Sequence, residues 1–245
     1  MTSHDKRWHF RAPWCTITRV ITDNEALVRA AALNNAEWCD ALSRTHGVKG
    51  EFGAAAWTAP RRTPPYYPDA VTLTADADAA QILERVDTSS DDCSVKDSYS
   101  SLDLSAAGFE VLFDAQWIHR STSTPFPRTE LRWRRVETAA ELAAWEAAWD
   151  GGVTDLFLPD LLADETVAVL AAFDGSAVVA GAVANRSASV VGLSNTFGDW
   201  PGALAQIAHL WPGLPVVGYE SGDDLDAALA QGFEAIGPLR IWLAQ

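Results

Sequence analysis

The chain has 245 residues, of which 48% are hydrophobic and 21% charged, and its formal net charge is −15. Such a composition can build two hydrophobic cores, and no apolar run approaches the roughly 18 residues that a membrane span needs. From Val136 to the C-terminus, 15 Asp or Glu stand against two bases, Arg186 and Arg240, so we expect neither a nucleic-acid nor a membrane partner.

The chain start and the cysteines indicate the compartment. The opening residues, MTSHDKRWHFR, contain no apolar signal segment. Cys15, Cys39 and Cys93 are odd in number and have no CxxC spacing, which is typical of reduced thiols. We therefore expect a cytoplasmic protein, and the absence of HExxH or clustered Cys and His predicts no metal site.

The first predicted elements are a helix and a stiff loop. Residues 24–44 form an amphipathic pattern, in which Asn34 and Asn35 indicate either a kink or a ligand contact. The segment 57–73 is dense in Pro, and its rings and cations suit recognition of a carboxylate, phosphate or flat ring. Its substrate-binding candidates are Trp57, Arg61, Arg62, Tyr66 and Tyr67. The alternative is a scaffold whose rings cover the core and whose arginines pair with the acidic second half.

Residues 70–118 then read as strand, helix, strand, helix, Gly-Phe and strand, and the first of these helices is an acidic amphipathic segment. The second strand, CSVKDSY, brings Lys96 and Asp97 to its end as further substrate-binding candidates. Adjacent strand residues point to opposite faces, so at most one of them enters a pocket. Asp97 has a second interpretation, because aspartate commonly caps a following helix.

The second half begins after a Ser, Thr and Pro-rich connection at 120–130. We predict a strand at 131–136, helices at 139–149 and 156–162, and a hairpin of strands 167–173 and 177–184 around Asp174-Gly175. Asn185 and Arg186 are expected to be exposed turn residues. A strand at 189–197, a helix at 202–210, a strand at 215–220 and a helix at 223–231 follow, before Gly232-Phe233.

The last of these elements repeat the order found at 70–118. The offset between the copies is nearly constant, 190 − 70 = 120 at the first strand and 232 − 108 = 124 at the Gly-Phe pair. Repetition at this spacing predicts two tandem domains of one α/β fold with a mixed sheet, residues 1–125 and 126–245.

This order of elements resembles the GNAT acetyltransferase superfamily over about the last 115 residues. The resemblance implies acetyl-CoA binding by the fourth strand and the following loop and helix, with Leu193, Ser194, Asn195, Gly202 and Ala203 as cofactor-binding candidates. Asn195 interrupts an apolar strand, so it either braces the strand or meets a ligand.

Glu220 and Tyr219 follow an apolar strand and are the catalytic candidates. A carboxylate there accepts the ammonium proton, and a phenol donates to sulfur. The alternative is that Tyr219 packs on the core and Glu220 caps the next helix.

Two family motifs are altered. The loop Gly198–Ala203 reads GDWPGA where the superfamily has Q/R-x-x-G-x-G/A, so Asp199 opposes phosphate and Pro201 lacks an amide hydrogen. The family's helix tyrosine is replaced by Ala228, and by Leu104 in the first copy.

The leading hypothesis is an N-acyltransferase that moves an acyl group from acyl-CoA to a small amine. The alternative is a repurposed GNAT-like protein that binds a small molecule or a partner without acetyl-CoA. A homodimer is the default expectation for the assembly.

Overall fold

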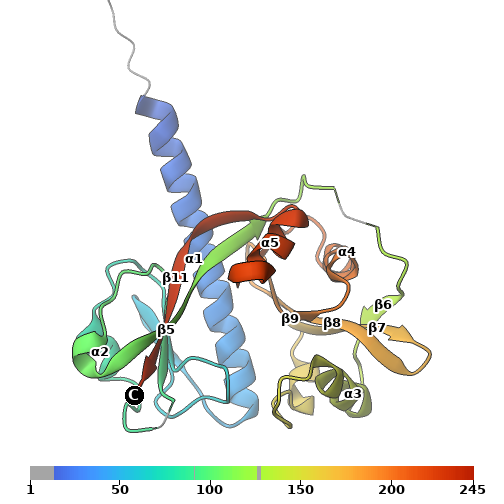
Figure 1. The fold of residues 1–245 in the computed structure, drawn as a ribbon, viewed down its shortest axis with the longest axis horizontal. Coiled ribbons are helices and arrows are strands. Elements are labelled where there is room, and N and C mark those ends of the chain that lie inside the picture. The colour runs from blue at the N-terminus through green and yellow to red at the C-terminus, as the bar shows by residue number, and fades with distance from the viewer. Residues whose placement is uncertain (1–13, 91, 126–127) are drawn as a thin grey trace, which may run out of the picture.

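The computed structural model describes residues 14–90, 92–125 and 128–245. One mixed sheet of eleven strands runs through the molecule in the order β1-β2-β3-β4-β11-β5-β10-β9-β8-β7-β6. The two halves of the chain lie on either side of the central strands β5 and β11, and the long helix α1 crosses behind them (Figure 1). The predicted α/β fold with a mixed sheet is confirmed.

The first half contains one long helix and five strands. Its elements are α1 (Trp14–Thr45), β1 (Glu51–Phe52), β2 (Ala56–Thr58), β3 (Ala70–Thr72), α2 (Ala79–Leu83), β4 (Ser94–Asp97), the 3-10 turn η1 (Ser105–Ala107) and β5 (Phe109–Arg120). The two helices predicted between these strands are therefore shorter than expected. Helix α1 begins ten residues before the predicted start; the N-terminal segment used to argue location lies outside the described residues.

The second half follows the predicted order closely. Its elements are β6 (Trp133–Arg135), α3 (Ala139–Trp149), η2 (Pro159–Ala163), β7 (Val167–Asp174), β8 (Ala177–Arg186), β9 (Val191–Phe197), α4 (Trp200–Leu210), β10 (Val216–Glu220), α5 (Gly222–Ala230) and β11 (Glu234–Ala244). Helix α3 is capped at its start by Thr138, whose side chain accepts from the Glu141 amide, and at its end by Asp150 in the left-handed conformation.

The two halves repeat the same pairing. Strand β3 pairs parallel with β4, and β9 pairs parallel with β10. Each copy then reaches its last strand through a glycine with φ of +84°, Gly108 and Gly232. An L residue with a side chain rarely adopts that conformation, so the glycine is required at both turns.

The central strands are exchanged between the halves. Strand β5 of the first half lies between β10 and β11 of the second, and β11 in turn lies between β4 and β5 of the first. All three contacts are antiparallel, and β5 pairs with β11 along the whole length of β11, from Phe109↔Ala244 to His119↔Glu234. One strand follows each Gly-Phe pair, and each half extends its part of the sheet with the other half's strand.

Apolar residues alternate along the inner strands and supply both faces of the sheet. On β7, Val167 and Val169 face the core under α1 and α3, whereas Ala168 and Leu170 face the core under α4. Helix α1 packs on strands of both halves. No helix in the described ranges is long and apolar enough to cross a bilayer.

Candidate functional site

A cavity of about 200 Å³ lies where β9 and β10 part. Their parallel pairing ends at Val217↔Gly192, and beyond this pair Leu193–Asn195 and Gly218–Glu220 line opposite walls. Backbone N–H and C=O groups that have no partner strand are free to hydrogen-bond to a ligand. The parting of the strands thus makes a slot with free backbone edges.

Asn195 bends β9 away from its neighbour. Its φ is +51°, and the register with β8 shifts between Gly181 and Val183, so β9 holds one extra residue there. Asn adopts the left-handed conformation more readily than most residues. Its side-chain oxygen lies 3.5 Å from the Tyr67 hydroxyl. Asn195 therefore both shapes the slot and lines it.

Glu220 lines the slot as a half-buried carboxyl group. Burial, with a smaller contribution from Asp224, raises its pKa from 4.5 to about 7. Within the described part of the chain, Glu220 makes no ion pair. A carboxyl group with this pKa exchanges protons near neutrality, which is what general base catalysis requires.

Tyr219 and Lys96 meet at one wall of the cavity. The Lys96 ammonium lies 4.1 Å from the centre of the Tyr219 ring, which packs edge-on against Trp117 at 5.7 Å. The ammonium also donates to the Asn35 side-chain oxygen at 2.7 Å. Tyr219 thus packs on aromatic and cationic neighbours, as one of its two sequence interpretations held, and it also lines the cavity.

Burial also suppresses ionisation of two acidic groups at the cavity wall. It raises the pKa of the Tyr67 phenol well above its ordinary value and that of the Cys39 thiol to about 11. Both groups line the cavity and stay protonated near neutral pH. Tyr67 therefore keeps its phenolic hydrogen, which it donates to the Asn195 side-chain oxygen at 3.5 Å.

Buried asparagines join α1 to the second half beside the slot. Asn34 donates from its side chain to the Asn185 carbonyl at 2.9 Å, and the Asn185 side chain donates to the Asn34 carbonyl at 2.9 Å. The prediction that Asn185 is an exposed turn residue is wrong, since it is 5% exposed. An asparagine at a strand end is typical of an exposed turn, and the sequence does not show that Asn34 on α1 is its hydrogen-bond partner.

The corresponding slot in the first half is closed by its own side chains. Parallel pairing ends at Val71↔Lys96, and beyond it the Ser98 amide donates to Thr72 Oγ1 at 2.7 Å while the Tyr99 hydroxyl donates to the Leu73 carbonyl at 3.0 Å. Asp97 is fully buried outside the cavity and accepts from the Leu102 amide at 2.8 Å. Of the two slots that the described residues form, the second is the one that holds a cavity.

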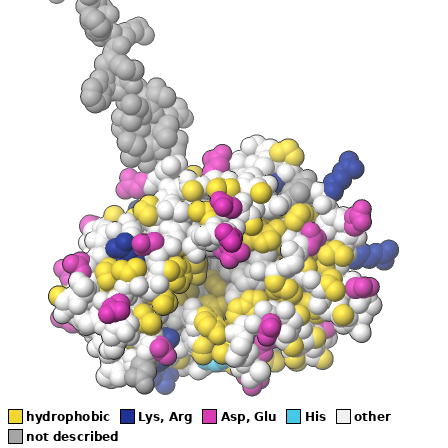
Figure 2. Space-filling model, viewed as in Figure 1, with side chains coloured by type: hydrophobic (Ala, Val, Ile, Leu, Met, Phe, Trp, Pro, Cys, Tyr) yellow, Lys and Arg dark blue, Asp and Glu magenta, His cyan; other side chains and the backbone are white. Residues whose placement is uncertain are grey.

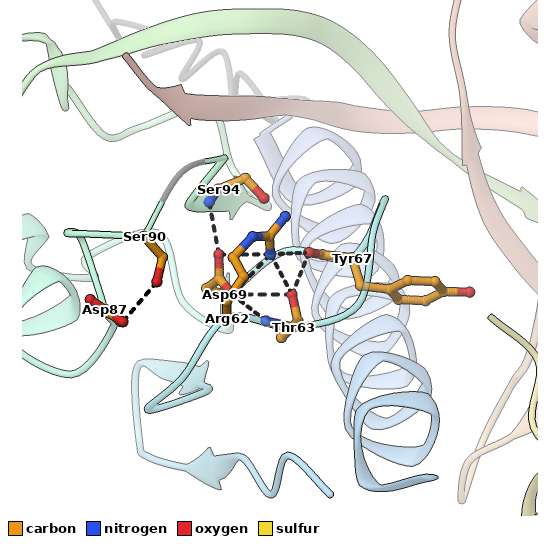
Figure 3. A network of polar contacts seen from close by, with 7 residues as sticks. All are labelled: Arg62, Thr63, Tyr67, Asp69, Asp87, Ser90 and Ser94. Carbon is orange, nitrogen blue, oxygen red and sulfur yellow. Dashed lines mark hydrogen bonds and ion pairs between the residues drawn. The ribbon is translucent and has the colours of Figure 1, made fainter. Parts of the chain in front are cut away.

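Some side chains of the Pro-rich loop hold the loop itself together, and others line the cavity. Arg62 pairs with buried Asp69 at 3.0 Å, and Asp69 also accepts from the Thr63 and Ser94 amides (Figure 3). The Tyr67 ring points away from this network (Figure 3). The arginines therefore do not pair with the acidic second half, because the loop carries its own carboxylate.

The remaining loop candidates lie in different places. Trp57 is fully buried and donates to Asp40, and Arg61 donates to the Gly47 carbonyl. Tyr66 lines the cavity and donates to the Gly151 carbonyl at 2.5 Å. Of the seven substrate-binding candidates, the cavity brings together Tyr66, Tyr67 and Lys96, and leaves out Trp57, Arg61, Arg62 and Asp97.

The start of α4 is poorly suited to phosphate. The Asp199 carboxylate is fixed there by Thr129 and by the Trp133 indole at 3.1 Å, and Pro201 offers no amide hydrogen. Gly202 and Ala203 are buried and do not line the cavity. Gly202 instead lets Trp133 approach, because a Cβ there would lie 1.8 Å from the indole nitrogen.

A second, larger groove adjoins the cavity. Its volume is about 680 Å³, and it shares Tyr66, Pro68, Lys96 and Tyr219 with the cavity. Apolar side chains of the exchanged strands form its floor, namely Leu112, Phe113, Ile241 and Leu243. One face of the molecule is hollowed between the two halves, with hydrophobic side chains around the hollow (Figure 2). No group of side chains in the described ranges is suited to hold a metal ion.

Solved structures resemble this architecture. A GCN5-related N-acetyltransferase from Kribbella flavida superposes with a TM-score of 0.60 at 12% identity, covering 90% of this chain and 95% of that chain. A protein of the GNAT family from Novosphingobium aromaticivorans gives 0.52 at 12% identity, over 86% and 97%. A functionally unknown conserved protein from Staphylococcus epidermidis gives 0.51 at 12% identity, over 77% and 83%.

These likenesses define the class of fold. No family model and no curated protein sequence matches the chain. The chain has the GNAT fold, as its element order predicted.

Proposed function

We propose that the protein is a GNAT-type N-acyltransferase that uses the second unit to move an acyl group from acyl-CoA to a small amine. The observation that carries this proposal is the open slot between β9 and β10 with Glu220 on its wall. Tandem units of one fold, with the first slot closed, leave the second as the reaction site.

The residues of the slot fit the parts of acyl transfer. Acyl-CoA supplies the thioester carbonyl. A backbone amide in the segment Leu193–Asn195 polarises that carbonyl, since β9 has no ladder partner on this edge beyond Gly192.

Glu220 accepts a proton from the substrate ammonium, directly or through water, and the neutral amine then attacks; its pKa of about 7 lets Glu220 take up and release protons near neutrality. Tyr67, protonated and within 3.5 Å of Asn195, is a candidate donor to the leaving sulfur. Tyr219 is the donor that the sequence favoured, and it lies at the same wall.

A second candidate function is ligand binding in the same slot without acyl-CoA. The start of α4 favours it, because Asp199 and Pro201 replace the anion-binding groups that pyrophosphate needs. In this case the slot holds a small molecule and Glu220 serves as a binding group.

Calorimetric titration with acetyl-CoA separates the two candidates. Acyl transfer predicts saturable binding, and a panel of primary amines with detection of the released thiol then tests turnover. Gly218→Val should abolish the binding, because Gly218 lines the slot and a Cβ there already lies 3.0 Å from the Leu193 carbonyl. No binding to the unmodified protein would exclude the acyltransferase and leave the second candidate.

Turnover should also depend on the carboxylate. Glu220→Gln should lower kcat/KM about a hundredfold or more. Glu110→Gln is the matched control, since Glu110 is exposed on β5 and lines neither cavity. Equal loss in both variants would contradict the assignment.

A further inference from the structure

The structure points to an acid as the ligand: we propose that Lys96 binds a carboxylate, so that the molecule taken by the site carries an anionic group beside an apolar body. As a description of the acyl acceptor, this inference rests on the proposed function; as a binding property it does not.

The Lys96 ammonium is buried without an opposite charge. The side chain is 3% exposed, and no carboxylate within the described ranges forms an ion pair with it. An ammonium has three donor hydrogens, and here one meets Asn35 while the Tyr219 ring faces the charge. Buried charges in proteins are normally paired, so an anion is the missing partner.

Two carboxylates near Lys96, Asp97 and Asp69, are engaged elsewhere. Asp97 lies next to Lys96 in the chain but serves the turn amides, and across the sheet it is paired in register with Arg240, which binds Asp114. Asp69 is held by Arg62. Neither is therefore available to neutralise Lys96.

Lys96 stands on the wall that joins the two cavities. On one side lies the slot with Glu220, and on the other the apolar groove. In the sheet, Lys96 pairs in register with Ile241, and Ile241 with Phe113, which places these side chains in one row on one face. When the carboxylate of the ligand binds Lys96, an apolar group of the same ligand lies along Ile241 and Phe113. Its amine then extends toward Glu220.

Titration calorimetry with paired probes tests this inference without acyl-CoA. The acids are acetate, 3-phenylpropanoate and L-phenylalanine. Each is compared with the amide in which an uncharged carboxamide replaces the carboxylate: acetamide, 3-phenylpropanamide and L-phenylalaninamide. We expect at least one acid to bind at least tenfold more tightly than its amide. Lys96→Met should remove this preference, whereas Lys49→Met should keep it, because Lys49 is exposed and lines neither cavity.

Circular dichroism confirms that each variant is folded before titration. The inference is overturned if no acid binds at millimolar concentration, if acids and amides bind alike, or if Lys96→Met retains the preference. Acetyl-CoA affinity does not enter these outcomes. Acid binding without acetyl-CoA binding would remove the acyltransferase and leave the anion site standing.

Discussion

Substituting Glu220 by Gln tests the electrostatics of the slot through stability. The pKa of Glu220 is raised on folding from 4.5 to about 7, so the folded protein holds this proton more tightly than the unfolded chain does. A carboxyl group with a raised pKa destabilises the folded state as pH rises, because ionisation in the unfolded chain is easier. The loss begins near the unfolded pKa and is complete above the folded one.

The magnitude follows from the shift. A difference of 7 − 4.5 = 2.5 pKa units corresponds to about 3 kcal/mol in the limit, and to about 2.5 kcal/mol between roughly pH 5 and pH 8. Since Glu220 is half-buried, solvent screening makes this an upper bound. Gln has no charge to lose, so Glu220→Gln should gain up to this amount relative to the wild type over the same interval.

Urea unfolding at a series of pH values measures the effect. The quantity to compare is the difference in unfolding free energy between variant and wild type, in which the titrations of all other groups cancel. Glu110→Gln should give a difference that does not change with pH. A flat profile for Glu220→Gln, or a difference that grows toward low pH, would refute the assigned pKa and with it the general base.

The remaining predictions concern packing beside the slot and in the loop. Gly192→Ala should lower the unfolding free energy by about 2 kcal/mol in urea titrations, because its Cβ would lie 2.0 Å from Asn34 Oδ1; an unchanged midpoint would contradict the packing. Asn34→Ala should cost about 1–3 kcal/mol, since it leaves the buried Asn185 carbonyl without its donor, and a loss below about 0.5 kcal/mol would argue against this bond. Arg62→Ala should cost about 3 kcal/mol by leaving Asp69 buried and unpaired, whereas Arg61→Ala should change stability by less than about 0.5 kcal/mol; similar losses would remove the distinction drawn between the two arginines.

Much of the fold was predictable because local patterns encode local structure. The repeated element order, the Asp174-Gly175 turn and the two Gly-Phe pairs each depend on a few neighbouring residues. The exchange of β5 and β11 was not predictable in this way. Alternating apolar residues say that a strand is buried, and they do not say which strand lies beside it.

The site was predictable to a similar extent. Tyr219, Glu220 and Asn195 were predicted to lie together because the ends of neighbouring parallel strands lie at the same edge of a sheet, and all three line one cavity. The density of rings and cations in the loop 57–73 made Trp57 a substrate-binding candidate, but Trp57 is buried and donates to Asp40, which lies on a helix 17 residues earlier in the chain. The buried state of Lys96 follows from its neighbours across the sheet, so its sequence context gave no sign that the charge lacks a partner.

The order of the central strands in the chain also determines when each can pair during synthesis. Strand β5 is complete at Arg120, but its partner β11 begins only at Glu234, which is 234 − 120 = 114 residues later. At about 5–20 residues per second, roughly 6–23 s pass before β11 begins to be made, and during that time the edge of β5 that pairs with β11 is open. An unpaired strand edge of this kind is a template for aggregation, and here it is covered only when the residues of β11 have been made.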